Sequence, residues 1–155
     1  MKVGVFILLT AAIVTGYVFS EDGTESFKTD LDYAQVVHVR AVQNAQGLWQ
    51  FDVTVRHNDE GWNHYADAWQ IVNPKNGTVI SERILAHPHV EEQPFTRSKG
   101  GIALPAGLKE VLVRAKCQLH GFGGQEILVP LKPGKSSLFE VLMNKAAKEG
   151  LHKAY

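Results

Sequence analysis

The histidines are the residues whose number and spacing point to chemistry in this sequence. The 155-residue chain contains seven histidines and a single cysteine. Five of the histidines fall in three short polar segments: His57, His64, His87, His89 and His120. Imidazoles beside carboxylates match the ligands that Cu²⁺, Zn²⁺ and Ni²⁺ prefer, whereas the lack of a thiolate in these segments disfavours Cu⁺. The spacing therefore predicts a copper or zinc site that takes three or four ligands from this set.

Three acidic residues near these histidines are candidates for a supporting role. Asp67 is in phase with Trp69, which predicts a buried carboxylate that accepts a hydrogen bond from a histidine ring and orients it toward the metal. Asp59 and Glu92 are the other two candidates. Each has a simpler alternative, because Asp59 can form a local turn bond and Glu92 can lie in solvent. His57 can likewise be a neutral histidine at the edge of the core.

Alternating apolar and polar residues predict the elements that hold these segments. Seven stretches are short, rich in β-branched or aromatic residues and bounded by Gly, Asn or Pro, which is typical of strands. They are residues 35–43, 48–57, 64–72, 78–86, 101–104, 110–118 and 125–131. Cys117 alternates in phase with Val113 and is expected to be a buried thiol of the core. The pattern predicts an immunoglobulin-like antiparallel β-sandwich of about seven strands over residues 35–131, with Trp69 in its core.

The order of the strands predicts that the histidines converge. When successive strands run antiparallel, every second connection lies at the same end of the sandwich. The connections after the second, fourth and sixth strands carry the five histidines, and the alternate connections are ordinary turn sequences without a histidine. We therefore expect the five imidazoles at one end.

The two ends of the chain have different compositions. Residues 1–20 consist of a basic start and an apolar run, which predicts a signal peptide with the mature chain beginning at Glu21. An uncleaved anchor is the alternative, and only then is a membrane expected as a partner. Residues 21–34 are polar and are expected to be a flexible lead-in. Residues 132–155 are predicted to be a linker and a C-terminal helix, because Ser137 and Glu140 have the spacing of a capping box.

Charge narrows the classes of partner. The 16 basic residues equal the 16 acidic residues, so no overall charge attracts nucleic acid. A single cysteine forms no disulfide within the chain. Together with the signal peptide, this predicts a periplasmic or secreted protein that does not bind nucleic acid.

Three motifs carry a resemblance to a family. They are His57-x-Asp59-x-Gly61-Trp62-x-His64-Tyr65-Ala66-Asp67-x-Trp69, then Ala86-His87-Pro88-His89-x-x-Glu92-Gln93-Pro94-Phe95-Thr96-Arg97, and His120-Gly121-x-Gly123-Gly124. The region from residue 48 to residue 131 resembles an uncharacterised family of small exported bacterial proteins. The resemblance implies the same site residues and a periplasmic setting, and it implies no activity.

These observations lead to three functional hypotheses. The leading one is a periplasmic metal-binding protein, a carrier or sensor of copper or zinc, whose partner is the metal ion. The alternative is a metal-free adhesion or interaction module that recognises another periplasmic protein. The third is a metal-dependent hydrolase with Asp59 or Glu92 as general base. Because no His-Glu-x-x-His or Gly-x-Ser-x-Gly motif is present, no catalytic residue and no enzymatic activity are assigned.

Overall fold

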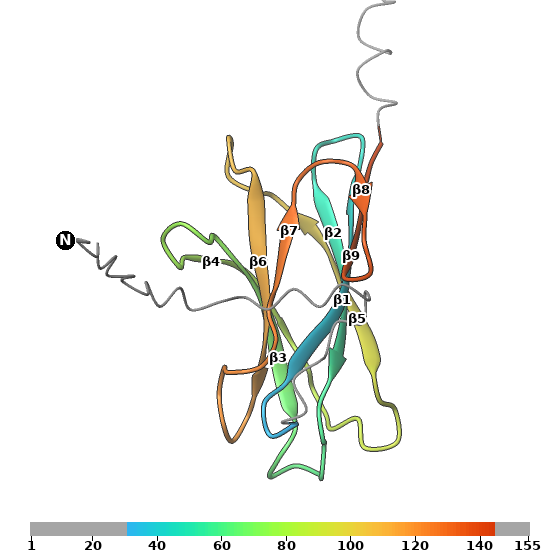
Figure 1. Ribbon diagram of the computed structural model, residues 1–155, viewed down its shortest axis with the longest axis vertical. Helices are drawn as coiled ribbons and strands as arrows, with labels where there is room; N and C mark the ends of the chain where they lie inside the picture. Colours follow the sequence, from blue (N-terminus) through green and yellow to red (C-terminus); the bar gives the residue numbers. More distant parts are fainter. Residues whose placement is uncertain (1–30, 145–155) are drawn as a thin grey trace, which may run out of the picture.

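The computed structural model describes residues 31–144, which form two packed β-sheets (Figure 1). One sheet has the order β5-β2-β1-β9-β8 and the other the order β4-β3-β6-β7. The strands are β1 (Gln35–Gln43), β2 (Trp49–Arg56), β3 (Ala66–Val72), β4 (Val79–Ile84), β5 (Phe95–Ile102), β6 (Glu110–Cys117), β7 (Ile127–Pro130), β8 (Gly134–Lys135) and β9 (Phe139–Met143). The prediction of an all-β, two-layer fold is confirmed.

Alternation along the strands builds the core between the sheets. In β2 every second residue from Trp49 to Val55 is buried, and in β6 the same is true from Val111 to Cys117. The largest fully buried side chain is that of Trp69, as the sequence predicts. Strand β3 belongs to the middle of its sheet and is buried almost throughout, so both of its faces are covered. The core therefore fixes the ends of β2, β3 and β6, from which the histidine-bearing loops start.

The C-terminal part of the described chain differs from the prediction of a helix. Residues 139–143 form strand β9, which pairs in parallel with β1, and Val141 is 1% exposed in the core. Leu138, Val141 and Leu142 fit a helical period, whereas Phe139, Val141 and Met143 fit a period of two, and pairing with the edge of β1 decides the outcome. Ser136 accepts backbone hydrogen bonds from Leu138 and Phe139 in the β8–β9 turn. The rest of the predicted helix, from residue 145, lies outside the described residues.

Two further boundaries differ from the predictions. Strand β5 starts at Phe95, six residues before the predicted start, because Phe95 is buried in the core and pairs with Val55 of β2. Residues 31–34 pack on the sandwich instead of forming part of a flexible lead-in, since Ala34 is 1% exposed. The sandwich thus extends beyond the predicted 35–131 at both ends. The predicted signal peptide, residues 1–20, lies outside the described residues.

Asp67 lies at an irregularity in β3 that changes its phase. The pairing of β3 with β6 shifts register between Ala66 and Ala68, which is the geometry of a β-bulge. Asp67 is consequently half-buried, and its carboxylate forms an ion pair of 3.1 Å with Lys116. The prediction that a histidine would bind Asp67 is wrong, because strict alternation cannot anticipate a bulge.

Within residues 31–144, no helix is long and apolar enough to cross a membrane.

Candidate metal centre

Three loops meet at one end of the sandwich, at the bottom of Figure 1. They connect β2 to β3, β4 to β5 and β6 to β7, and we call this region the histidine end (residues 57–65, 85–94 and 118–126). The rings of His57 and His64 lie 4.8 Å apart between centroids, and those of His64 and His120 lie 4.9 Å apart. His87 and His89 form a second ring pair at 4.5 Å. The predicted convergence of the loops is confirmed.

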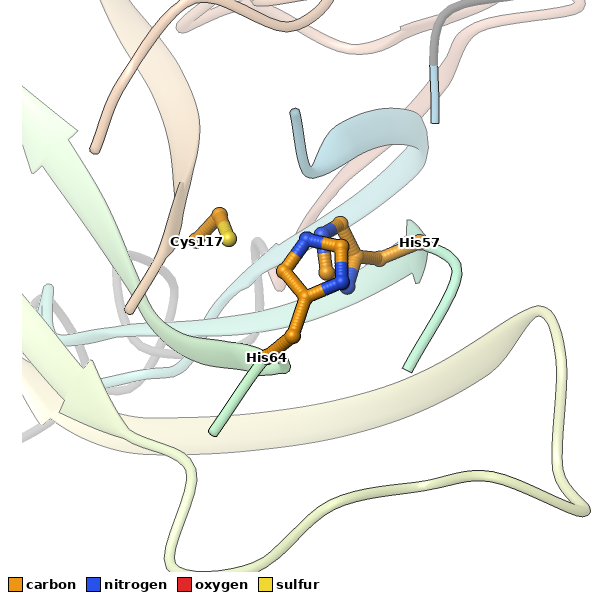
Figure 2. A group of neighbouring side chains, drawn as sticks. All are labelled: His57, His64 and Cys117. Carbon is orange, nitrogen blue, oxygen red and sulfur yellow. The ribbon is translucent and has the colours of Figure 1, made fainter. Parts of the chain in front are cut away.

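The centre of the histidine end contains a buried group of three potential ligands. One atom from each of His57, His64 and Cys117 lies within 4.8 Å of the other two (Figure 2). His57 is 1% exposed, His64 7% and Cys117 0%. Figure 2 shows the two rings together with the sulfur directed toward them. Ligand atoms about 2.0–2.3 Å from one ion lie roughly 3–4 Å apart, so the three atoms would approach one another by up to about 1 Å to hold an ion.

The ring of His57 has an oxygen atom close to each of its two nitrogens. Its Nδ1 lies 2.6 Å from Oδ1 of Asp59, and its Nε2 lies 3.2 Å from the carbonyl oxygen of Asp32. A carboxylate only accepts hydrogen bonds, so Nδ1 must carry the proton. In the neutral imidazole Nε2 then has a lone pair and cannot donate to the carbonyl. Nε2 is therefore the atom that can bind a cation, in the arrangement in which a carboxylate orients a ligating histidine.

The ring of His64 is oriented by a carboxylate in the same way. Its Nδ1 lies 3.0 Å from a carboxylate oxygen of Glu60, which fixes the proton on Nδ1. Its Nε2 is buried and has no hydrogen-bond partner. A buried polar atom without a partner costs about 1–3 kcal/mol, so such atoms are rare unless something else binds them.

His120 covers this group from the solvent side. Its Nδ1 lies 2.9 Å from the carbonyl oxygen of Asp32 and 3.5 Å from the sulfur of Cys117. The residue is exposed, and its ring also contacts Tyr33. Because Nδ1 donates to the carbonyl, Nε2 of His120 is left with a lone pair. His120 is thus placed to be an additional, solvent-accessible ligand.

Gly124 allows residues 32–34 to approach the site. A Cβ at this position would lie 2.0 Å from the carbonyl oxygen of Ala34, which no side chain tolerates. The backbone amide of Val36 donates to the carbonyl of Gln125 at 2.9 Å and ties the two segments together. The glycine therefore brings the Asp32 carbonyl to the histidines, and a larger residue would push it away.

Asp59 connects the two groups of histidines. One of its oxygens accepts from Nδ1 of His57 and from the backbone amide of Ala66, and the other accepts from the backbone amide of His89 at 2.6 Å. Burial alone would raise the pKa of Asp59, but these hydrogen bonds together lower it below its ordinary value. Asp59 is therefore an ionised carboxylate that fixes two loops and one imidazole.

His87 and His89 form a separate pair beside the buried group. The His89 ring stacks on Phe95 at 3.8 Å, and both of its ring nitrogens are buried without a hydrogen-bond partner. Burial, with the positive charges of Arg97 and His87, lowers the pKa of His89 and favours the neutral ring. His87 is exposed, and its Nδ1 contacts the carbonyl of Pro88. The His-Pro-His segment thus borders the centre but does not join the closest group of ligands.

Glu92 and Cys117 are the residues whose positions differ most from the sequence-based site. Glu92 is exposed, and its carboxylate pairs with Arg97 at 2.8 Å. Cys117 is buried as predicted, but it lies at the last position of β6, where the core meets the histidine end. The three-residue spacing to His120 is the signal in the sequence that could have placed the thiol there.

The fold and this site define a two-layer all-β protein with a buried group of two histidines and one cysteine. A "Putative lipoprotein" from Halomicrobium mukohataei is 42% identical to this chain over 114 residues. The match covers 73% of this chain and 55% of that protein, so the chain spans about half the length of its relative. No protein-family model and no solved structure match the chain.

Proposed function

We propose that this chain is an exported metal-binding protein, a carrier or sensor of copper or zinc, whose metal centre is the histidine end. The observation that carries the proposal is the buried group of His57, His64 and Cys117, whose ligand atoms lie within 4.8 Å of one another. Hydrogen bonds to Asp59 and Glu60 leave a lone pair on Nε2 of each histidine. A bound cation would satisfy both lone pairs at once.

The setting of the proposal is outside the cytoplasm. Residues 1–20 have the sequence of a signal peptide, and the relative from Halomicrobium mukohataei is described as a lipoprotein. A periplasmic or secreted location fits both observations. We also assign the sandwich to the immunoglobulin-like class, because β1, β2 and β5 form one sheet and β4, β3, β6 and β7 form the other, in the manner of such domains.

A purely structural role explains the polar cluster less well. A histidine that only completes the core finds partners for both ring nitrogens or leaves one in water. Nε2 of His64 does neither, and both nitrogens of His89 are equally without partners. Three unpartnered imidazole nitrogens at one end of a small sandwich are expensive unless they bind something in the working protein.

The test is metal binding by the mature chain, purified without a histidine tag. Calorimetric titration with Cu²⁺ and with Zn²⁺ is expected to give one site per chain, with an affinity that falls in acid because protons compete with the metal for the imidazole nitrogens. His64→Ala should lose at least tenfold in affinity. The control is His38→Ala, since His38 lies in β1 outside the histidine end. A wild-type protein that binds neither metal more tightly than the unfolded chain does would refute the proposal.

An interaction module is the second candidate, and one observation favours it. Trp62 is 66% exposed and Leu119 is 63% exposed, and both lie on the loops of the histidine end. Exposed large apolar residues at one end of a domain are typical of a surface that contacts another protein. If no metal binds, this surface with its histidines becomes the leading candidate for function.

A further inference from the structure

We propose that Cys117 binds the metal as a thiolate beside His57 and His64, and that this donor set makes the centre selective for copper. The inference rests on the proposed function and names the metal that the site takes. It also departs from the expectation from the sequence, which placed no thiolate among the histidines.

The position of Cys117 is fixed by the backbone on both sides. It pairs with Ala66 across the sheet, and it exchanges two backbone hydrogen bonds with Gly121, of 2.8 and 2.9 Å. Gly121 adopts a φ of 74°, which a glycine accommodates without strain and which closes the tight turn after β6. The sulfur is therefore held in a fixed position, from which it can bind a metal ion without a rearrangement of β6.

The surroundings of the sulfur are those of a ligand. A buried cysteine of the core normally contacts apolar groups on every side. The sulfur of Cys117 instead lies within 4.8 Å of a ligand atom of His57 and of His64, and 3.5 Å from Nδ1 of His120. The buried, unpartnered Nε2 of His64 belongs to the same group and is an independent sign that a ligand binds there.

The donor set distinguishes copper from the other metals. Two imidazoles and one thiolate in a trigonal arrangement are the ligands of copper sites, and the thiolate also stabilises Cu⁺. Structural zinc sites are almost always tetrahedral with four strong ligands. Here the fourth position falls to exposed His120, since Asp59 already accepts hydrogen bonds with both oxygens. Two buried imidazoles and a thiolate, with an exposed fourth position, therefore match the trigonal sites of copper more closely than the closed tetrahedral sites of zinc.

Binding involves the loss of one proton and no change in oxidation state. The thiol of Cys117 releases its proton to solvent as the sulfur–copper bond forms. Nδ1 of His57 keeps its proton and its hydrogen bond to Asp59, and the metal binds at the opposite nitrogen. Either Cu²⁺ or Cu⁺ can bind in this way.

Visible absorption during an anaerobic Cu²⁺ titration of the mature chain is the first test. A thiolate–Cu²⁺ bond absorbs strongly in the visible range, whereas copper bound only to nitrogen and oxygen absorbs weakly. We expect the strong band in the wild type and in His38→Ala, and its loss in Cys117→Ala together with at least a tenfold lower copper affinity. Thermal unfolding of Cys117→Ala without metal checks that the variant is folded.

X-ray absorption of the copper-loaded wild type tests the same point without a substitution. One sulfur is expected in the coordination shell, with two or three nitrogens. Copper that binds with a shell of nitrogen and oxygen alone would overturn the role of Cys117 while leaving the proposed function intact. Tighter binding of Zn²⁺ than of Cu²⁺ in direct competition would overturn the selectivity. Failure to bind any metal would refute both proposals.

Discussion

Replacing Asp59 with asparagine tests the hydrogen-bond network that assembles the histidine end. The carboxylate is fully buried and accepts from three donors: Nδ1 of His57 and the backbone amides of Ala66 and His89. Asparagine keeps the shape but offers one accepting oxygen and one NH₂ group, so the NH₂ group of the new side chain faces at least one of these three donors. Charged hydrogen bonds contribute about 1.5–3 kcal/mol each, and an unsatisfied buried donor costs about 1–3 kcal/mol. We therefore expect Asp59→Asn to lower the free energy of unfolding by about 2–4 kcal/mol.

The same substitution acts on metal binding through the proton of His57. The new NH₂ group can donate to Nδ1, which moves the ring proton to Nε2 and toward the Asp32 carbonyl at 3.2 Å. Nε2 then has no lone pair for a metal, and a tenfold to hundredfold loss of copper affinity is expected. NMR of the imidazole nitrogens would show the change of tautomer directly.

The matched control is Asp52→Asn in β2. Asp52 also accepts from three side chains, Arg40 at 3.1 Å, Gln50 at 2.8 Å and Ser98, but it lies near the surface with 18% of its side chain exposed. Its loss should lower the free energy of unfolding by less than about 1 kcal/mol. Urea denaturation of the two variants provides the comparison. Equal effects for Asp59→Asn and Asp52→Asn would refute the network described for Asp59.

Three other predictions follow from the fold and from the ionisable groups. The pKa of His89 lies below its ordinary value of 6.5, so the unfolded chain binds a proton at this residue at a higher pH than the folded chain does. The stability of the metal-free protein should therefore fall as the pH drops below about 6.5. His89→Phe should give a flatter stability profile in urea denaturation between pH 5 and 7. Truncation after Leu131 removes β9 and should destabilise the sandwich, and an unchanged melting temperature would contradict the pairing of β9 with β1. The single substitution Val141→Ala should lower the free energy of unfolding by about 2 kcal/mol, as measured by thermal unfolding. Because Asp67 pairs with partly exposed Lys116, Asp67→Asn should change the free energy of unfolding by no more than about 1 kcal/mol in urea denaturation, and a larger loss would show that its carboxylate has a buried partner.

The strands were predictable where one face of a strand is buried and the other is not. Residues 49–55 and 111–117 alternate strictly, so β2 and β6 were located to within a residue or two. Strand β9 was not predictable, because its five residues fit a helix and a strand equally well and only the free edge of β1 decides between them. The bulge at Asp67 was not predictable for the same reason, because a register shift depends on how two strands pair and not on the sequence pattern of one strand.

The site was predictable in its location and only in part in its members. Chain direction was enough to bring His57, His64 and His120 together, because antiparallel strands return their loops to the same end. The division between this group and the His87–His89 pair depends on the path of the β4–β5 loop, which no local pattern encodes. Cys117 was assigned to the core alone, since alternation tells which face a residue occupies but not whether the core at that level is polar.

The carbonyl of Asp32 has a consequence for how the histidine end opens. This carbonyl oxygen lies close to rings from two different loops, and it belongs to the short segment before β1 in which Ala34 is buried and Leu31 and Tyr33 are partly buried. Segments of this kind detach at a small fraction of the free energy of global unfolding. Local opening of this segment would uncover His57 and remove the carbonyl contact of the exposed His120, with both sheets left intact. Both sheets can then stay folded while the histidine end becomes accessible to solvent, and the rate of this opening depends on the few residues that precede β1.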